Sequence, residues 1–477
     1  MRSRTVGSTL ATRLAAIVLA AFVAACGGGG GSDAPPPPPP KAGQFDPSFG
    51  RSGLFELVVP EFAATSTAAG ALSIDGGGRL LAAGWSSVPG TGLPDGALFV
   101  RVLPSGLADP GFAGSGYVRI THPVPRRDVG TGAFPIDAGR SLVVDAGHDM
   151  CLLPPPQCPA IYPWAMVRRL NADGSVDPAL LYSFAPVYES QTIGEPDGSI
   201  VILGTGEPAP GSQFWSIVAA RIRVDGVPDP EFGTRAGEAM KCPALPDTSF
   251  HVSRMARLAG GKFLVARMNT AATEDWDRIR ICVSRLMPDG SLDTTYGTGG
   301  RLYVTSPAYV GTGVVELLER SDGRVALVQR KNIVGRPGSG SIVWLTAAGA
   351  VDTAMGAGGL TSPLPALGYL TSAAIQPDDR ILVAGWPADP ASPDLLGPWD
   401  YGKPSLVRLD ASGGADATFG EGGVAHLVAA GVPLQPLRIA VGANASIFVA
   451  GSAGRTPGGT AAEPSRLAIG KLAGRGP

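Results

Sequence analysis

The side chains best suited to recognition in this chain are tryptophans and tyrosines that gather in a few irregular segments. Six of the seven tryptophans lie in or beside these segments, namely Trp85, Trp164, Trp215, Trp276, Trp386 and Trp399, with Tyr162 and Tyr401 nearby. Aromatic rings bury much surface, and tyrosine and tryptophan keep one polar atom, which suits a glycan or a protein ligand. The competing interpretation is that the tryptophans cover apolar strand edges at the bases of loops.

Segment 387–404, PADPASPDLLGPWDYGKP, is the most distinctive of these, because its prolines stiffen a backbone that also carries Trp399 and Tyr401. We place the best single binding site there. The full predicted binding set is Trp85, Tyr162, Trp164, Trp276, Trp386, Trp399 and Tyr401. The loop around Cys151 and Cys158 is the second candidate.

Catalytic constellations are not convincing. Asp389, Asp394 and Asp400 could supply the paired carboxylates of a sugar-cleaving enzyme, but acidic residues in a loop are usually solvated. The sequence has no Gly-x-Ser-x-Gly elbow, His-Glu-x-x-His helix, phosphate loop or dinucleotide fingerprint. We therefore predict a binding or scaffolding module with no catalytic residues and no cofactor. A glycan-active hydrolase or lyase is the alternative.

The N-terminus reads as an export signal. It has three arginines, an apolar stretch over 14–25 that is too short for a membrane span of about 20 residues, and then Cys26. The sequence VAAC at 23–26 resembles the lipobox of bacterial lipoproteins, in which the cysteine is acylated and becomes the new N-terminus. The resemblance implies a signal peptide over 1–25, a lipid on Cys26 and, from the glycine that follows, the outer membrane. An ordinary secretory signal with a chance cysteine is the other interpretation.

Residues 26–42 are glycine- and proline-rich and are expected to form an extended tether. The whole chain has 38 Lys and Arg against 40 Asp and Glu, so loss of the three signal arginines leaves it mildly acidic. With no basic stripe, this balance argues against nucleic-acid binding. The expected partners are the membrane, through the lipid, and an envelope protein or glycan; we expect a monomer.

Four cysteines remain besides Cys26, an even number in an exported chain, and three pairings are possible. Cys151 and Cys158 flank a short loop that a bridge would staple, which leaves Cys242 and Cys282 for each other. Zinc is a weaker interpretation, because there is no Cys-x-x-Cys pair and no histidine recurs at a fixed position. We predict two disulfides and no metal.

The candidate binding residues and cysteines lie in a chain built from a sequence repeat. A nine-residue phrase is clearest as RLNADGSVD at 169–177 and RLMPDGSLD at 285–293. The same frame fits 101–109, 221–229, 344–352 and 408–416, and a truncated copy starts at Lys471. A pattern that recurs at this period predicts one repeat architecture rather than several independent domains.

The sequence of each repeat unit predicts four β-strands. It opens with a corner such as DPSFG at 46–50, where Asp bonds nearby amides, Gly accepts positive φ and the aromatic anchors the loop. Two strands follow, then an Asp-Gly type hairpin turn, a continuously apolar third strand and a fourth strand that ends in the phrase. Seven such units predict an all-β fold, a seven-bladed β-propeller of four-stranded antiparallel blades over 43–477. The third unit is degenerate, and whether it forms a full blade is open.

The corner, the hairpin before an Ile/Leu-Val-Ala-Gly strand and the phrase Arg-Leu-x-x-Asp-Gly-x-x-Asp together resemble the bacterial delta-60 repeat. The third unit lacks the Phe-Gly, and the fifth has Trp344 in place of Arg. The resemblance covers nearly all of the mature chain and implies a propeller of exported proteins.

Residues that recur in every unit are expected to have a structural role that every unit shares. We expect the Asp residues to cap turns, and the five phrase arginines to pair with carboxylates between adjacent blades: Arg101, Arg169, Arg221, Arg285 and Arg408. Function is expected where the units differ, chiefly in the insertions between the third and fourth strands. These should all project to one face.

Overall fold

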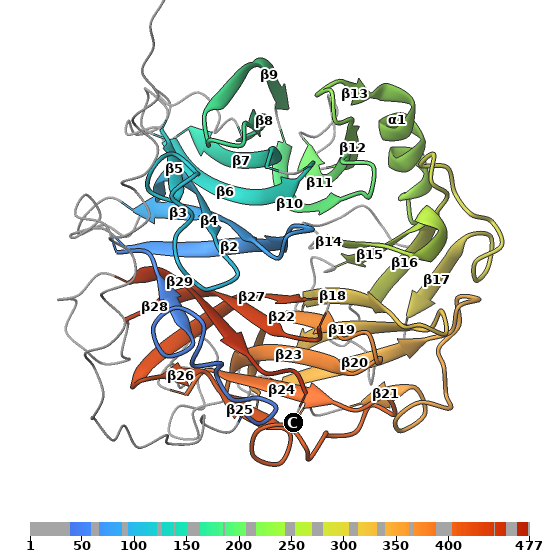
Figure 1. Cartoon of the computed structure of the whole chain (residues 1–477). Helices are drawn as coiled ribbons and strands as arrows, with labels where there is room; N and C mark the ends of the chain where they lie inside the picture. The colour runs from blue at the N-terminus through green and yellow to red at the C-terminus, as the bar shows by residue number, and fades with distance from the viewer. Residues whose placement is uncertain are drawn as a thin grey trace, which may run out of the picture. The chain divides into compact units, whose positions relative to one another are not determined.

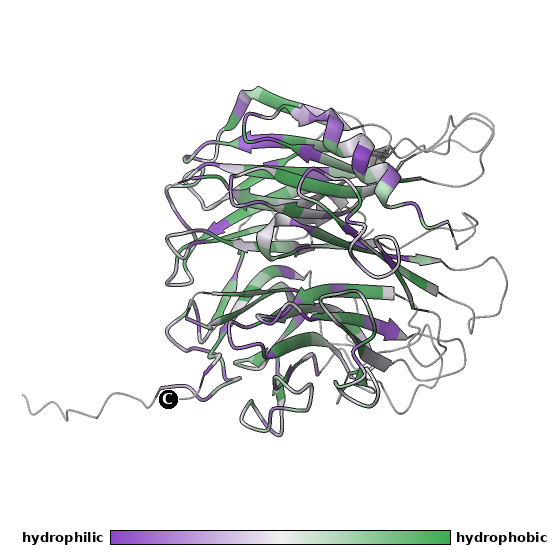
Figure 2. Cartoon of the chain, turned by 90° about the vertical axis from the view of Figure 1, so that its right-hand side faces the viewer, coloured by the Kyte–Doolittle hydropathy of each residue, from purple (hydrophilic) through white to green (hydrophobic). Residues whose placement is uncertain are grey.

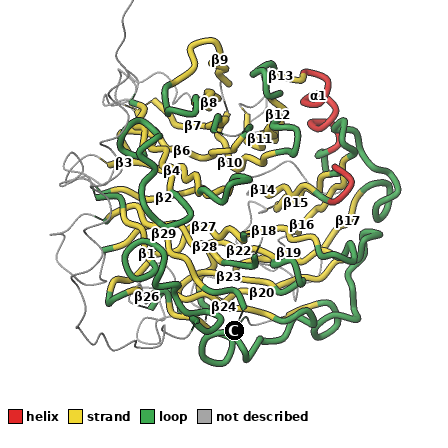
Figure 3. Tube along the Cα trace, in the orientation of Figure 1, coloured by secondary structure: helices red, strands yellow, loops and turns green. Residues whose placement is uncertain are grey.

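The computed structural model describes the chain from Pro39 to Arg475 with gaps. The described residues are 39–58, 66–87, 94–121, 126–137, 139–149, 163–184, 187–206, 216–243, 253–269, 280–304, 313–331, 339–361, 364, 367–387, 403–442, 444–454 and 465–475. From Pro40 onward they belong to one folded unit. Apart from helix α1 (Pro230–Ala239) and a 3-10 turn at Ala259–Gly261, the elements that the described residues form are strands (Figure 3).

Within the described residues the strands form seven antiparallel sheets, the blades of a seven-bladed β-propeller (Figure 1). The predicted fold is confirmed. Blades 1 to 3 consist of β2 (Thr67–Ile74), β3 (Leu80–Ser87), β4 (Pro94–Val102), β5 (Tyr117–Ile120); β6 (Arg126–Pro135), β7 (Ser141–Asp149), β8 (Pro163–Leu170), β9 (Val176–Phe184); and β10 (Val187–Gly194), β11 (Ile200–Gly206), β12 (Ser216–Ile222), β13 (Pro228–Asp229).

Blades 4 to 6 have the same order. They consist of β14 (Ser253–Arg257), β15 (Phe263–Asn269), β16 (Arg280–Leu286), β17 (Arg301–Val304); β18 (Gly313–Glu319), β19 (Val325–Lys331), β20 (Ser339–Leu345), β21 (Leu360–Thr361); and β22 (Tyr369–Ile375), β23 (Ile381–Trp386), β24 (Ser405–Leu409), β25 (Val424–His426).

Blade 7 joins the two ends of the folded unit. Its strands are β26 (Val428–Ala429), β27 (Val432–Val441), β28 (Ile447–Ala453), β29 (Arg466–Leu472) and the N-terminal β1 (Leu54–Glu56). β1 pairs antiparallel with β29, Leu54 opposite Gly470, so blue and red strands lie side by side in Figure 1. This pairing closes the ring, because blade 7 takes its outer strand from the N-terminal end of the folded unit.

The sequence unit and the blade are out of phase by one strand. We expected the strand after each corner to open a blade, but it is the outer strand of the blade formed by the preceding strands: β5, which follows corner 109–112, pairs with β4. The reason is the phrase itself, since it turns the fourth strand of one unit directly back onto the first strand of the next. The continuously apolar third strands of the units, such as β3 and β23, lie second in their sheets, with a paired strand on each side.

The seventh copy of the phrase is divided between the two ends of the chain. Lys471 and Leu472 supply its first half, and Gly43 to Asp46 supply the second. Phe45 bridges Leu472, just as Leu292 bridges Leu286 in the intact copy of blade 4. The amide of Asp46 donates to the carbonyl of Lys471 at 2.8 Å, the bond that Asp293 makes to Arg285 at 2.9 Å.

Helix α1 is the main departure from the predicted repeat. The sequence at 229–233 reads as a corner, but Asp229 is instead a helix N-cap whose carboxylate accepts from the amide of Phe232. Pro230 at the start and Glu231 in the first turn favour a helix as well. The outer strand β13 is only 2 residues long, and α1 lies beside blade 3 in its place (Figure 1).

The core lies between blades, where the hydrophobic positions of the strands meet (Figure 2). The first strands of the blades contact each other in sequence, from β2 and β6 round to β22, β27 and back to β2, and form an inner ring. The second strands pack behind them; all six residues of β23, for example, are buried. A corner aromatic such as Phe112, which is fully buried, seals the outer side of the seam.

Two faces follow from the strand directions. The turn face carries the hairpins between first and second strands and the turns made by the phrases. The opposite face, which we call the insertion face, carries the strand ends that flank the insertions of all seven units. In blade 1 these are Ser87 at the end of β3 and Pro94 at the start of β4. The insertions themselves lie largely outside the described residues.

Candidate functional site

The recurring arginines hold the propeller together on the turn face. Arg101 Nε donates to Asp109 Oδ2 of its own phrase at 2.7 Å, and Arg285 makes the same contact to Asp293 at 2.7 Å. We expected carboxylate partners on the adjacent blade, and this is wrong, because the turn brings the two ends of one phrase together. The next blade is reached through its backbone instead: Arg285 Nη1 donates to the carbonyl of Ala347 at 2.7 Å.

The same guanidinium groups cover the corner aromatics. Arg101 lies 4.6 Å from the ring centroid of Phe112, and Arg408 lies 4.5 Å from that of Phe419. Arg101 is 6% and Arg408 3% exposed, so ion pair and cation–π contact are both largely shielded from water. Because these contacts recur in several blades, we interpret the phrase arginines as structural.

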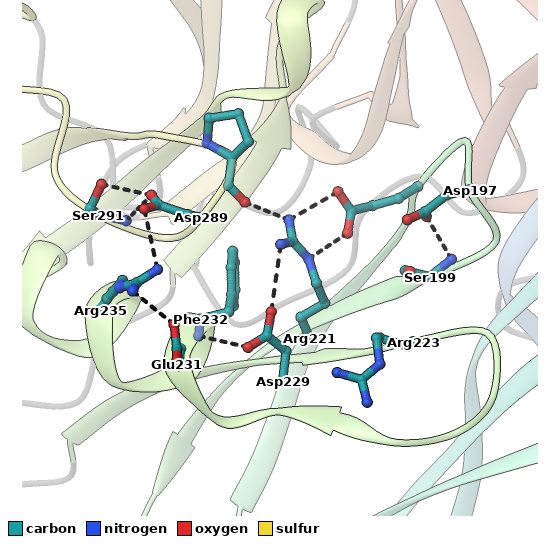
Figure 4. A network of polar contacts seen from close by, with 12 residues as sticks. Asp197, Ser199, Arg221, Arg223, Asp229, Glu231, Phe232, Arg235, Asp289 and Ser291 are labelled. Atoms are coloured by element: carbon teal, nitrogen blue, oxygen red, sulfur yellow. Dashed lines mark hydrogen bonds and ion pairs between the residues drawn. The ribbon is translucent and has the colours of Figure 1, made fainter.

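Figure 4 shows how blade 3 adapts this arrangement to helix α1. Arg221 is paired mainly with Glu195, at 2.8 Å and 3.2 Å, and lies 3.9 Å from Asp229, which is occupied as the helix N-cap. It also donates to the carbonyl of Pro288 at 2.7 Å. Arg235 of the helix connects Glu231 to Asp289 of blade 4. The helix is thus fastened to the neighbouring blade.

Of the predicted aromatic binding set, the structure describes Trp85, Trp164 and Trp386. Trp164 is 6% and Trp386 9% exposed, and Trp85 is half-buried at the end of β3. These rings pack at the strand ends of the insertion face. The remaining members, Tyr162, Trp276, Trp399 and Tyr401, lie outside the described residues, as do Cys26, Cys151 and Cys158.

Trp386 belongs to a stack that spans three blades at the insertion face. Its ring lies 5.5 Å from that of Tyr369, and the guanidinium of Arg330 lies 4.8 Å from the Tyr369 centroid. Arg330 Nη1 donates to the Tyr369 hydroxyl at 2.6 Å, and Trp386 Nε1 donates to Gln435 Oε1 at 2.5 Å. Tyr369 is half-buried, so this stack presents an aromatic edge with a polar border.

Cys242 and Cys282 are joined by a disulfide. It links the segment after α1 to β16 of blade 4, and Tyr303 of β17 packs against it. Arg301 holds the same segment by donating to the carbonyls of Lys241 and Ala239. The bridge is buried and structural.

One serine and histidine lie within hydrogen-bond distance, but they do not form a nucleophile and its base. Ser405 Oγ is 3.1 Å from His426 Nδ1 because the two residues are paired across β24 and β25. Ser405 is fully buried, and its hydroxyl also reaches the carbonyl of Lys403 at 2.9 Å. A substrate cannot approach it. The described residues contain no cluster of three acidic, histidine or cysteine side chains that could hold a metal ion.

The blades differ most clearly at one position of the inner ring. In each first strand this is the residue four places before the residue that opens the hairpin turn. The seven residues are Ala71, Gly132, Gln191, Arg254, Glu316, Ser372 and Arg438, which we call the axial ring. Each is paired with an apolar residue of the second strand, for example Glu316 with Val328 and Arg438 with Ala450. The strand positions are equivalent, but the chemistry is not.

Three side chains of the axial ring bond to the next first strand. Gln191 donates to the carbonyl of Met255 at 2.9 Å and accepts from its amide at 2.7 Å. Arg254 Nε donates to the carbonyl of Val315 at 3.2 Å, and Ser372 Oγ accepts from the amide of Ile439 at 3.2 Å. These bonds fix the ring members to rigid strands.

The charged members of the axial ring lie on blades 4, 5 and 7. The carboxyl of Glu316 is influenced by Arg254 on the adjacent strand and by Arg438, which lies beyond β22. Burial raises the pKa of Glu316, and the two positive charges only partly oppose this. Arg254, Glu316 and Arg438 nevertheless keep intermediate exposure, although inner strands flank each of them. The interior of the ring therefore carries partly hydrated charges.

Sequence reasoning missed the axial ring, because it looked for residues that recur and this position varies. The axial ring can be found in the sequence as one position of an alignment of the seven units. If the units are aligned on the first residue of the hairpin turn, the fourth residue upstream is small in two blades, polar in two and charged in three. Its neighbour Leu317, by contrast, is buried between blades.

Comparisons with known proteins support the fold alone. No family model and no curated protein matches the sequence. The chain is similar to the crystal structure of polysaccharide lyase Uly1, with a TM-score of 0.52 and 10% identity over 91% of this chain and 92% of that one. It is more distantly similar to an α-L-arabinofuranosidase of Fusarium graminearum, with a TM-score of 0.40 and 8% identity over 87% and 97% of the two chains.

Proposed function

We propose that this protein is a non-catalytic glycan-binding module built on a β-propeller, with its ligand at the insertion face and over the inner ring. The observation that carries the proposal is the axial ring, where seven equivalent strand positions hold Arg254, Glu316 and Arg438 among neutral residues. Residues that differ from blade to blade at an equivalent position cannot have a structural role common to all blades. It fits a ligand that meets each blade differently.

A glycan is favoured over a protein by the residues between the ring and the insertion face. The half-buried ring of Tyr369 packs on the buried Trp386 and lies beside Arg330, which combines an apolar ring edge with a hydrogen-bonding group at short range. Sugars present both kinds of surface, because their C–H faces are apolar and their hydroxyls are not. The predicted loop residues Trp399 and Tyr401 would extend this surface.

The second candidate function is a glycan-active hydrolase or lyase. The fold likeness to a polysaccharide lyase and the raised pKa of Glu316, a property of general acids, favour it. Against it, sugar hydrolysis generally takes two carboxyl groups, and the axial ring contributes Glu316 alone. Binding without chemistry is the simpler use of these residues.

We further propose that the module is held in the bacterial envelope by a lipid on Cys26, at the outer membrane. The chain enters the folded unit through residues 42–46, which complete the seventh phrase on the turn face. A tether that attaches there leaves the insertion face on the opposite side from its own attachment point. The described residues include no helix long and apolar enough to cross a membrane.

The test is capture of envelope glycans and proteins by the folded fragment from Pro40, with Trp399→Ala, Tyr401→Ala and wild type in parallel. Binding of a glycan without release of shorter products supports the module. Loss of capture in the loop variants would locate the ligand beside 387–404. Release of new reducing or unsaturated ends would establish the enzyme instead, and capture of proteins alone would refute a glycan ligand.

A further inference from the structure

The axial ring carries a charge of the opposite sign to the whole protein. The formal net charge of the chain is −2, yet two of the three charged ring members are arginines. These two are fixed by backbone carbonyls: Arg254 Nε donates to Val315, and Arg438 Nη1 donates to Leu437 at 2.9 Å. A guanidinium group has five N–H donors in a planar fork, which matches the oxygens of a carboxylate or a sulfate.

Glu316 lies between these arginines in strand order. Arg254 is on β14, Glu316 on β18 and Arg438 on β27, and β22 between the last two contributes the neutral Ser372 at this level. The positive charges of Arg254 and Arg438 both favour the ionised form of Glu316, against the burial that raises its pKa. Glu316 is thus placed to act as a counter-ion for both arginines.

Small residues occupy the other side of the ring. Ala71 and Gly132 hold the equivalent positions in blades 1 and 2. The ring is therefore asymmetric: blades 4, 5 and 7 carry charged residues at this level, and blades 1 and 2 carry small ones. Because blades 4 and 7 are three apart in the ring of seven, a ligand on the axis would meet a positive charge from two directions.

We propose that Arg254 and Arg438 bind an anionic substituent of a glycan, a carboxylate or a sulfate ester, and that Glu316 is the resident anion with which it competes. The inference rests on the proposed glycan-binding function and names its ligand class. Two arginines on rigid strands give a preorganised site, while the shared Glu316 prevents two positive charges from standing opposed in the empty ring.

The competition makes binding depend on pH. Glu316 is negative above its pKa and neutral below it, so the net charge of the three residues rises from +1 to +2 on acidification. The other charged residues on Glu316's own strand and on strands packed against it are Glu319 on β18, Arg257 on β14, Arg267 on β15, and Arg330 and Lys331 on β19, while β22 has none. Affinity for an anionic glycan should therefore increase as pH falls through the pKa of Glu316.

The test compares matched probes on the mature chain by calorimetry. Tetragalacturonate and its methyl ester differ in charge but little in shape, and a sulfated galactan oligosaccharide with its desulfated form supplies the second pair. We expect one anionic probe to bind about tenfold or more tightly than its neutral partner, as charge-assisted hydrogen bonds would give. Which pair discriminates identifies the anion.

Variants assign the effect to the ring. Arg254→Gln and Arg438→Gln should each remove most of the discrimination, whereas Glu316→Gln should strengthen anion binding and abolish its pH dependence. Arg223→Gln, at an exposed turn on the opposite face, is the matched control and should bind like wild type. If a glutamine variant fails to fold, Arg254→Lys or Arg438→Lys keeps the charge but loses the fork, and should bind more weakly.

Equal binding of charged and neutral probes, or unchanged discrimination in both glutamine variants, would overturn the anion site. In that case binding of neutral glycans would leave the proposed module standing. Failure to bind any glycan would overturn both proposals. Discrimination that survives Arg254→Gln and Arg438→Gln but is lost in Arg223→Gln would place the anion on the turn face, against the inference.

Discussion

Lys471 Nζ lies 2.8 Å from Asp46 Oδ2, which joins the two ends of the folded unit by the contact that most of the phrases make internally. Elsewhere an arginine and an aspartate eight residues apart form this pair, as Arg101 and Asp109 do at 2.7 Å. At the closure the partners come from opposite ends of the sequence. The seam of blade 7 is therefore sealed by side chains as well as by the pairing of β1 with β29.

Replacing Lys471 by Gln should destabilise the propeller by about 1 kcal/mol, since its partner is only 19% exposed. Lys471→Arg should retain the stability, because arginine occupies this place in other blades. Lys241→Gln is the control: its pair with Glu238 is 63% and 69% exposed and should contribute almost nothing. Denaturant unfolding measures all three. Equal losses for Lys471→Gln and Lys241→Gln would mean that the closure pair is an ordinary surface contact.

Acid should destabilise the propeller through its aspartates. Burial tends to raise the pKa of Asp46, but hydrogen bonds from Lys471 and Ser48 outweigh it and the pKa is lowered. Asp416 behaves likewise, with burial opposed by bonds from Thr418 and by Arg408. A lowered folded-state pKa gives stability that is present above the unfolded pKa, near 4, and is lost as pH falls through the folded value.

Unfolding free energies between pH 7 and pH 2 check this prediction. Wild type should lose stability mainly below about pH 4. Asp46→Asn removes one of the contributing groups, so its curve should start lower and fall less steeply. A stability that stays constant down to pH 2 would contradict the proposed role of the paired carboxylates.

The corner aromatics should be the most costly single truncations. Phe419 is fully buried beneath Arg408, and Phe419→Ala should cost about 3 to 5 kcal/mol through lost burial and a cavity. Leu107→Ala is a suitable control, because Leu107 is 60% exposed. Thermal melting of both variants separates a seam residue from a surface one. A small shift for Phe419→Ala would show that the corner does not anchor the blade.

Fold and site were unequally predictable from sequence. The repeat defined seven blades because hairpin glycines, corner aromatics and phrase aspartates each meet a local steric need that recurs. Helix α1 was not predicted, although Asp229, Pro230 and Glu231 are typical of a helix start, because the repeat assigned the same residues to a corner. The carboxylate partners of the phrase arginines were also predicted wrongly, because the partner depends on how tightly the nine-residue phrase turns the fourth strand back onto the next strand. The axial ring becomes visible only when the strands are placed in register.

The disulfide between Cys242 and Cys282 should stabilise the segment after α1. Replacing both cysteines with serine should cost about 2 to 4 kcal/mol, the usual range for a bridge across a loop of this length, 40 residues. Proteolysis is expected to begin near Lys241, where Arg301 would be left to hold the chain. Non-reducing peptide mapping checks the bridge directly, and the same map tests the predicted bond between Cys151 and Cys158. A peptide that joins Cys151 to Cys242 would refute both pairings.

Lipidation at Cys26 is the prediction on which the envelope location depends. The lipobox-like VAAC at 23–26 predicts that globomycin, which inhibits lipoprotein signal peptidase, causes the precursor to accumulate. Cys26→Ser should prevent acylation and release the folded unit from the membrane fraction. Cys151→Ser is the matched control, because it replaces a cysteine without touching the signal and should leave the membrane fraction unchanged. Normal maturation in globomycin, with an unacylated N-terminus by mass spectrometry, would show instead an ordinary secreted protein. The propeller would then meet its ligand in solution.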